Sequence, residues 1–180
     1  MKSKKEIILE TATVLFAEQG FEKTSVASIC ENAGVSKGLV YHHFTSKEDI
    51  LIAIYEQSTQ EMMNLSNNDI EKKADEKLFK IIDTVFLQLE ENKLFFKLNL
   101  NIMFQPSTRK ILETQIKERA TQLFSVVKQI FNDIDLKNSE LLSYVLISEI
   151  DGIALSYLSS FEKYPLQEMK NQLLKKYKND

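Results

Sequence analysis

Apolar residues recur every three or four positions along most of the chain, with polar residues between them. In the first segment, about residues 3–19, Ile8, Ala12, Leu15 and Phe16 carry this pattern. The same spacing predicts further helices over residues 25–33, 37–44, 46–64, 75–91, 93–104, 107–132, 139–160 and 166–177. Because the strict alternation typical of a strand is missing from the sequence, we expect an all-α fold of about nine helices.

Residues at the segment ends predict where individual helices begin and stop. Ser3 with Glu6 has the form of a capping box at the start of the first helix. Gly20 suits the left-handed position that follows its last turn. Thr24 and Ser107 are expected to cap the second and seventh helices with their hydroxyl groups.

A polar stretch at about residues 66–74, which contains Asn67, Asn68 and Asp69, interrupts the helical pattern. It predicts a boundary between a small N-terminal bundle and a larger C-terminal one. We expect residues 1–47 to form the first domain and residues 48–180 the second, with the helix from about residue 46 connecting them.

Composition narrows the class of protein. Glycine and proline together number six, which leaves few turns and favours long helices. The lone cysteine, Cys30, cannot form an internal disulfide, and apolar runs stay short of the roughly 20 residues of a membrane span. We therefore expect a cytoplasmic protein without a membrane partner. The net charge of −3 means that nucleic-acid binding would depend on a local basic patch.

Residues 24–47 have the layout of a helix-turn-helix, in which a second helix enters the DNA major groove. Two short apolar-periodic segments are joined by Ala33-Gly34-Val35-Ser36. Gly34 permits a positive φ in the turn, and Ser36 is a good N-cap for the second helix. Hydrogen-bond donors that suit phosphates and bases surround this helix; they are Ser36, Lys37, Tyr41, His42, His43 and Lys47. Lys37, Gly38 and Leu39 open it, where base edges are reached.

Alternative readings of the same residues remain open. Tyr41, His42 and His43 could form an ordinary amphipathic surface. The two histidines point about 100° apart on a helix, which disfavours a shared metal ion. Cys30 fits a small core residue better than a nucleophile. We expect no catalytic residues, no metal and no cofactor.

One combination of motifs is specific to a known family. The motifs are Leu15-Phe16, Gly20-Phe21, Thr24-Ser25-Val26, Ile29, Ala33-Gly34-Val35-Ser36-Lys37-Gly38, Tyr41-His42-His43-Phe44 and Ser46-Lys47-Glu48. With them, residues 7–51 resemble the N-terminal domain of the TetR family of transcriptional regulators. The resemblance implies an all-helical homodimer, a palindromic operator, and a C-terminal domain for ligand binding and dimerisation.

The resemblance also implies which residues contact DNA. They are Ser25, Ser36, Lys37, Gly38, Leu39, Tyr41, His42, His43 and Lys47. Two positions depart from the family pattern. Cys30 stands where alanine is usual, and Leu39 stands where a small polar residue is common, so no known operator sequence is carried over to this chain.

The C-terminal residues predict an interface and a cavity. The helix over residues 139–160 is apolar on nearly all sides, so it should be buried on several of them, one against a second subunit. With the ninth helix, over residues 166–177, it forms the dimer face that the resemblance implies. The predicted ligand-binding residues are Phe86, Phe96, Asn99, Met103, Phe104, Phe124, Val127, Tyr144 and Glu149. Ordinary core packing is the alternative for most of them.

Together these patterns predict a regulator rather than an enzyme. We expect a repressor that a small hydrophobic effector releases from its operator. The alternative is a DNA-binding regulator that a protein partner controls without a small-molecule ligand.

Overall fold

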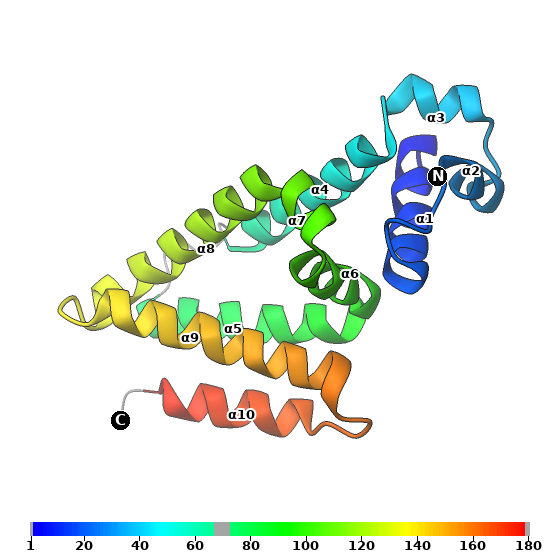
Figure 1. The fold of residues 1–180 in the computed structure, drawn as a ribbon. Helices are drawn as coiled ribbons and strands as arrows, with labels where there is room; N and C mark the ends of the chain where they lie inside the picture. Colours follow the sequence, from blue (N-terminus) through cyan, green and yellow to red (C-terminus); the bar gives the residue numbers. More distant parts are fainter. Residues whose placement is uncertain (1, 67–72, 179–180) are drawn as a thin grey trace. The chain divides into compact units, whose positions relative to one another are not determined.

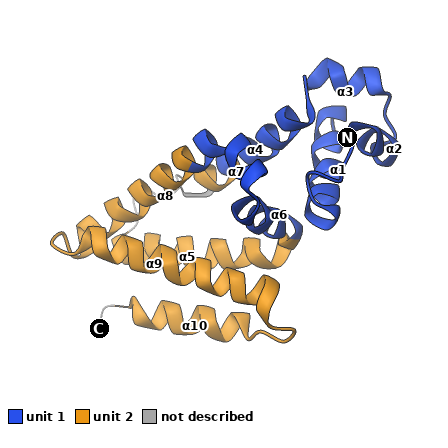
Figure 2. Ribbon diagram, in the orientation of Figure 1, with its two compact units in different colours: residues 1–60, 94–116 blue, residues 61–93, 117–180 orange. Residues whose placement is uncertain are grey.

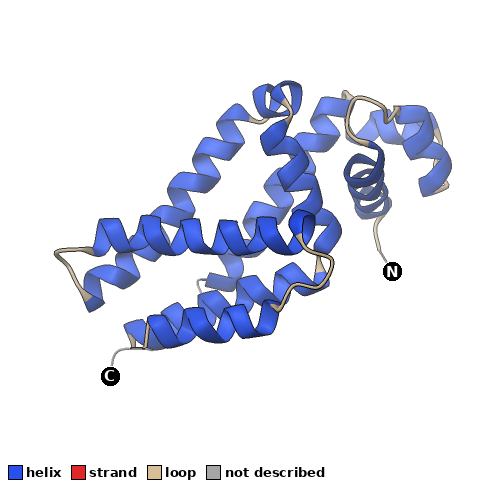
Figure 3. Cartoon of the chain, turned by 60° about the horizontal axis from the view of Figure 1, so that its bottom comes forward, coloured by secondary structure: helices blue, strands red, loops and turns tan. Residues whose placement is uncertain are grey.

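The structure, a computed structural model, describes residues 2–66 and 73–178. Within these ranges the chain forms ten α-helices and one π-helical turn and has no strand (Figures 1 and 3). The elements are α1 (Lys4–Gln19), α2 (Val26–Ala33), α3 (Lys37–His43), α4 (Lys47–Ser66), α5 (Ala74–Glu91), α6 (Lys93–Phe104), α7 (Pro106–Ile111), α8 (Glu113–Ile134), α9 (Ser139–Leu155), the π-helical turn η1 (Ser156–Ser160) and α10 (Leu166–Lys176). The all-α prediction of about nine helices is confirmed.

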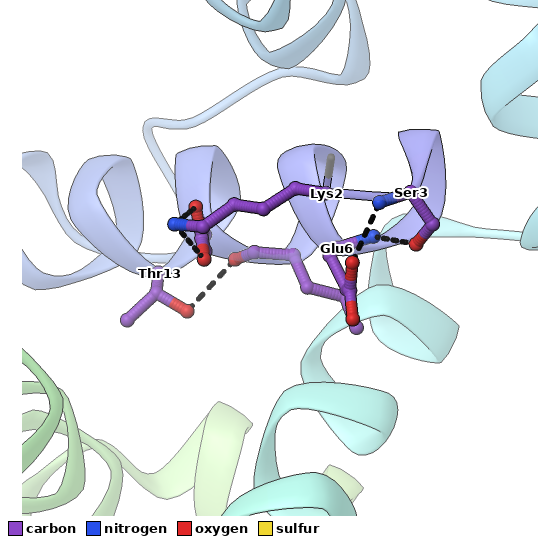
Figure 4. A network of polar contacts seen from close by, with 6 residues as sticks. Lys2, Ser3, Glu6 and Thr13 are labelled. Atoms are coloured by element: carbon purple, nitrogen blue, oxygen red, sulfur yellow. Dashed lines mark hydrogen bonds and ion pairs between the residues drawn. The ribbon is translucent and has the colours of Figure 1, made fainter.

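The start of α1 is closed by the predicted capping box (Figure 4). The Glu6 N–H donates to Ser3 Oγ at 3.2 Å, and the Ser3 N–H donates to the Glu6 carboxylate at 2.6 Å. The backbone hydrogen bond from Ser3 is the main reason why the pKa of Glu6 is lowered. Beside it, Lys2 forms an ion pair with Glu10 at 2.6 Å. Both side chains are largely exposed, so this is a surface ion pair that contributes little to stability.

Two predicted N-caps are wrong. Ser25, not Thr24, caps α2, and the two serines Ser25 and Ser28 cap each other reciprocally. Thr24 instead turns inward, and its buried hydroxyl donates to the Gly20 carbonyl at 2.9 Å. Ser107 does not cap a helix, because α7 already begins at Pro106. Proline suits the first turn of a helix, where an N–H group would have no partner within the helix.

The helix predicted over residues 107–132 is in fact two helices, α7 and α8. The chain turns at Leu112, whose backbone leaves the helical region at φ −101° and ψ 14° while its side chain becomes fully buried. The hydrogen bonds from Leu112 N–H to Thr108 and from Ile116 N–H to Leu112 keep helical spacing across the turn. The apolar periodicity therefore continues through the break, which explains the incorrect prediction.

The described chain divides into two compact units (Figure 2). Unit 1 contains residues 1–60 and 94–116, and unit 2 contains residues 61–93 and 117–180. The boundaries fall inside α4 and α8 and next to the start of α6. The predicted boundary between a DNA-binding domain and a second domain, after residue 47, concerns function and not compactness. It stays a prediction. The polar stretch predicted at about residues 66–74 falls largely on residues 67–72, which lie outside the described residues.

Unit 1 has one apolar core, to which α1 to α4, α6 and the α7–α8 junction contribute. This core contains the predicted apolar stripe of α1, which consists of Ile8, Ala12, Leu15 and Phe16. It also contains Val40 of α3 and Phe44, which follows α3. The Asn101 amide also donates to the Ala17 carbonyl, which joins α6 to α1. The first three helices, α1 to α3, therefore share their core with later parts of the chain.

Unit 2 is held together by α5, α8, α9 and α10. Its buried apolar residues are Leu78, Ile82, Phe86, Leu89, Val127, Ile130, Phe131, Leu146, Ile153, Leu166, Leu173 and Tyr177. α10 packs against α5, where Lys170 forms an ion pair with Asp83 at 3.1 Å. The predicted helix over residues 139–160 is confirmed, but its last turn is π-helical.

Candidate nucleic-acid interface

The turn between α2 and α3 has a well-defined helix-stop geometry. Gly34 adopts the left-handed conformation, with φ 61° and ψ 42°, as predicted. Its N–H donates to the Glu31 carbonyl, and the Val35 N–H donates to the Cys30 carbonyl. This pair of hydrogen bonds is a Schellman motif, in which the residue after glycine makes an apolar contact with the helix. Val35 is half-buried and packs against the core to which α2 contributes Ile29 and Cys30.

The second helix of the motif, α3, presents two different faces. Ser36 caps it, because its Oγ accepts the Leu39 N–H at 3.1 Å. Val40 and the following Phe44 are almost fully buried. The outward-facing residues of α3 are Lys37, Gly38, Tyr41 and His42, whereas Leu39 and His43 are half-buried. A helix that is anchored on one side therefore exposes donors on the other.

The outward face of α3 carries a positive charge over an aromatic ring. Lys37 Nζ lies 5.7 Å from the centroid of the Tyr41 ring, one helical turn along. Tyr41 is 47% exposed, so its hydroxyl lies within reach of a partner. The His42 and His43 rings meet edge to face at 5.1 Å. This face can donate several hydrogen bonds to an anionic backbone or to base edges.

Lys47 lies differently from Lys37, although both are predicted DNA contacts. Its ammonium donates to the Phe21 carbonyl at 2.8 Å and to the Thr24 carbonyl at 2.9 Å, and it lies 4.2 Å from the centroid of the Phe21 ring. Its side chain is half-buried. The sequence motif indicated neither Phe21 nor Thr24 as a partner of this lysine.

The residues predicted to bind ligand fall in both units, and each unit is considered by itself. In unit 1, Phe96 and Asn99 are half-buried on α6, while Met103 and Phe104 are 45% and 72% exposed. In unit 2, Phe86 and Val127 are buried, and the rings of Phe124 and Tyr144 lie together at 4.5 Å. The ligand-binding role of this set stays a prediction.

The polar members of the predicted set have partners within the protein. The Asn99 amide donates to the Phe95 carbonyl, one turn earlier on its own helix. The Glu149 carboxylate accepts hydrogen bonds from Lys176 and, at 2.9 Å, from the Tyr177 hydroxyl. Desolvation and this carboxylate together raise the pKa of Tyr177. Glu149 therefore links α9 to α10.

The arrangement of α2, the glycine turn and the exposed face of α3 defines a DNA-binding protein of the helix-turn-helix class. Residues 8–54 match the sequence model of a family described as "Bacterial regulatory proteins, tetR family". The N-terminal part of the chain is therefore a DNA-binding domain of the TetR family, which confirms the resemblance.

Relatives of the whole chain point to the same class. The chain is 29% identical to the Bacillus subtilis HTH-type transcriptional regulator YuxN over 163 residues, which cover 88% of the chain and 55% of YuxN. The chain thus spans about half the length of that relative. It is also 25% identical to the Bacillus subtilis fatty acid metabolism regulator protein, over 93% of the chain and 90% of the relative.

A solved structure shares the fold. The Bacillus subtilis transcriptional regulator FadR in complex with stearoyl-CoA aligns with a TM-score of 0.80 at 23% identity, over 96% of each chain. The match extends beyond the helix-turn-helix, so the C-terminal helices also follow the fold of such regulators.

Proposed function

We propose that this protein is a cytoplasmic transcriptional repressor that binds a palindromic operator as a homodimer and is released by a hydrophobic small molecule. The observation that carries the proposal is the exposed face of α3 in a TetR-type domain, with Lys37, Tyr41 and His42 turned outward. Together with Ser25, Ser36, Gly38, Leu39 and His43, these residues are our candidates for DNA contacts. Lys47, also predicted to contact phosphate, is considered separately below.

The exposed face of α9 supports the homodimer. Leu141, Tyr144 and Leu155 are 64%, 56% and 37% exposed in the single chain. Ser148 and Gly152 lie between them at helical spacing and are exposed as well. Apolar residues gathered on one helix face mark a surface that another protein covers. A second copy of α9, together with α10, would bury this stripe around a two-fold axis and place two α3 helices on one palindromic site.

The composition of α9 and η1 invites one other reading. Ser139–Ser160 is long and apolar enough to cross a membrane, and only 17% of its most apolar stretch is buried. A single such helix is weak support for a membrane span, and a subunit interface explains the same exposure. A subunit interface also agrees with Glu149, a carboxylate in the middle of α9 that accepts hydrogen bonds from Lys176 and Tyr177.

A long-chain acyl group is the first effector to test. The fatty acid metabolism regulator resembles this chain over nearly its full length, and FadR was solved with stearoyl-CoA. In this chain the rings of Phe124 and Tyr144 form an aromatic pair in unit 2, and Phe86 and Val127 lie buried in its core. A cavity that opened among such residues would favour a long apolar tail, with a few polar groups fixing its orientation.

The experiment begins with selection of a duplex from a random-sequence DNA library by the purified protein. Affinity for the selected duplex is then measured by fluorescence anisotropy with increasing stearoyl-CoA, with coenzyme A alone as the control. We expect enrichment of a palindrome and loss of binding with stearoyl-CoA only. Unchanged affinity with saturating bound acyl-CoA would contradict the ligand-responsive mechanism and favour control by a protein partner.

A further inference from the structure

The Lys47 ammonium binds backbone carbonyls of its own chain, and its side chain is half-buried. It is the first residue of α4, and its Nζ approaches three backbone carbonyls of the α1–α2 connection, those of Phe21 at 2.8 Å, Thr24 at 2.9 Å and Glu22 at 3.5 Å. The Phe21 ring lies against the same group, 4.2 Å from Nζ to the centroid. This ring is itself buried and packs on Phe16.

These contacts occupy most of the donor capacity of a lysine: the Phe21 and Thr24 carbonyls accept short hydrogen bonds, and the Glu22 carbonyl lies at the 3.5 Å limit. An ammonium group has three N–H donors and no acceptor, so three carbonyl oxygens and a ring face leave it little to offer a phosphate. The position also needs compensation, because a cation at the first residue of a helix opposes the helix dipole. The carbonyl oxygens of the α1–α2 connection supply the compensating negative potential.

The Lys47 ammonium connects the start of α4 to the segment between α1 and α2. Thr24, one of its acceptors, directly precedes Ser25, the N-cap of α2. On the other side, α4 is capped by Ser46, whose Oγ accepts the Asp49 N–H at 3.0 Å. The Lys47 contacts therefore hold the start of α2 at a defined distance from the start of α4, both within unit 1.

We propose that Lys47 is a positioning residue that holds α2, and through it α3, against α4, and that it is not a phosphate contact. This inference rests on the proposed DNA-binding function, and it revises the DNA-contact role that the sequence motif implied for this residue. Lys37, on the exposed face of α3, is the matched lysine, whose charge is free to contact DNA directly.

The salt dependence of DNA binding separates the two roles. A lost phosphate contact reduces the slope of log K against log salt concentration by roughly 0.9. Lys47→Met removes the ammonium and keeps an apolar stem, and Lys37→Met is the control. Both are measured on the duplex selected by the wild-type protein, at a temperature where circular dichroism shows each variant to be folded.

For Lys47→Met we expect at least a tenfold loss of affinity with an unchanged salt slope, together with a lower unfolding midpoint. For Lys37→Met we expect an unchanged midpoint and a slope reduced by roughly 1.8, because the proposed dimer would lose one contact from each subunit. A slope that falls by roughly the same amount in Lys47→Met, whatever its midpoint, would overturn the proposal, and so would wild-type affinity in that variant.

Amine labelling of the wild-type protein tests the inference even if Lys47→Met fails to fold. Acetic anhydride labelling, read by mass spectrometry, should modify Lys47 much more slowly than Lys37 in the free protein. DNA should protect Lys37 and leave Lys47 unchanged. Fast labelling of Lys47 that DNA suppresses would refute the positioning role. Failure of the wild-type protein to enrich any duplex would contradict the proposed function, while the free-protein labelling would still decide whether the backbone carbonyls hold the Lys47 ammonium.

Discussion

At the scale of single residues, the two glycines of the helix-turn-helix have different tasks. Gly34 has a φ of +61°, and a Cβ added there would meet no atom within 4 Å. Gly38 has no positive φ, and its added Cβ would meet Ser36 Oγ at 4.0 Å. Space is therefore available at both positions, and only the backbone conformation distinguishes them.

Gly34→Ala should destabilise the protein by about 1–2 kcal/mol, because a side chain is disfavoured in the left-handed region. Gly38→Ala, the matched control, should leave stability unchanged or raise it by up to about 1 kcal/mol, since alanine favours a helix. Urea unfolding followed by circular dichroism measures both. Equal effects of the two substitutions would show that the turn does not require the left-handed conformation.

Tyr177 shows how one hydroxyl can join two helices. It donates to Glu149 at 2.9 Å, and its buried ring lies 5.7 Å from that of Phe131, centroid to centroid. Tyr177→Phe keeps the ring and removes the hydrogen bond. We expect a loss of about 1 kcal/mol in the free energy of unfolding, a modest value because the carboxylate is partly exposed. Unaltered stability would mean that the hydrogen bond with water is equally good.

The same residue predicts a pH dependence. The pKa of Tyr177 is raised above its ordinary value of 10.0, chiefly by desolvation. The folded state thus favours the neutral phenol, so its stabilising contribution is complete below about pH 10 and declines as the pH rises further. The stability difference between wild type and Tyr177→Phe should therefore shrink above pH 10. A constant difference from pH 8 to 11 would contradict this.

At the scale of elements, helix ends and helix faces differ in how well local sequence describes them. The Ser3–Glu6 capping box, the Gly34 turn and the Ser36 cap involve groups only a few residues apart, and all three were predicted correctly. Thr24 was misassigned, because its hydroxyl reaches carbonyls at positions 15 and 20. A local rule cannot detect partners that the folding of α1 brings together.

The break between α7 and α8 has the same origin. Its hydrogen bonds keep the spacing of a helix, and the apolar pattern runs through it. Leu112 turns the chain because its side chain is buried in the core of unit 1, together with residues such as Leu98 and Ile102 that belong to another helix. Periodicity alone therefore predicts one helix where packing produces two.

At the scale of the whole molecule, the exposed stripe on α9 offers a test of the proposed dimer. Leu141→Lys should convert a dimer into a monomer at micromolar concentration, because an unpaired charge would be buried in the proposed interface. Leu136→Lys is the control, since Leu136 is 73% exposed in the loop before α9. Sedimentation velocity distinguishes the two species. A dimeric Leu141→Lys variant would place the interface elsewhere.

The sequence by itself determined the all-α class, the helix-turn-helix and its outward-facing Lys37, Tyr41 and His42, because these depend on periodicity, caps and a turn within about 24 residues. Tertiary structure alone decided that Lys47 meets the α1–α2 carbonyls and that Glu149 binds Tyr177, since these pairs are 23 to 28 residues apart. Lysine and glutamate side chains are usually exposed to solvent, so the local sequence does not show that either residue has a partner far along the chain. Only the packing of helices selects one.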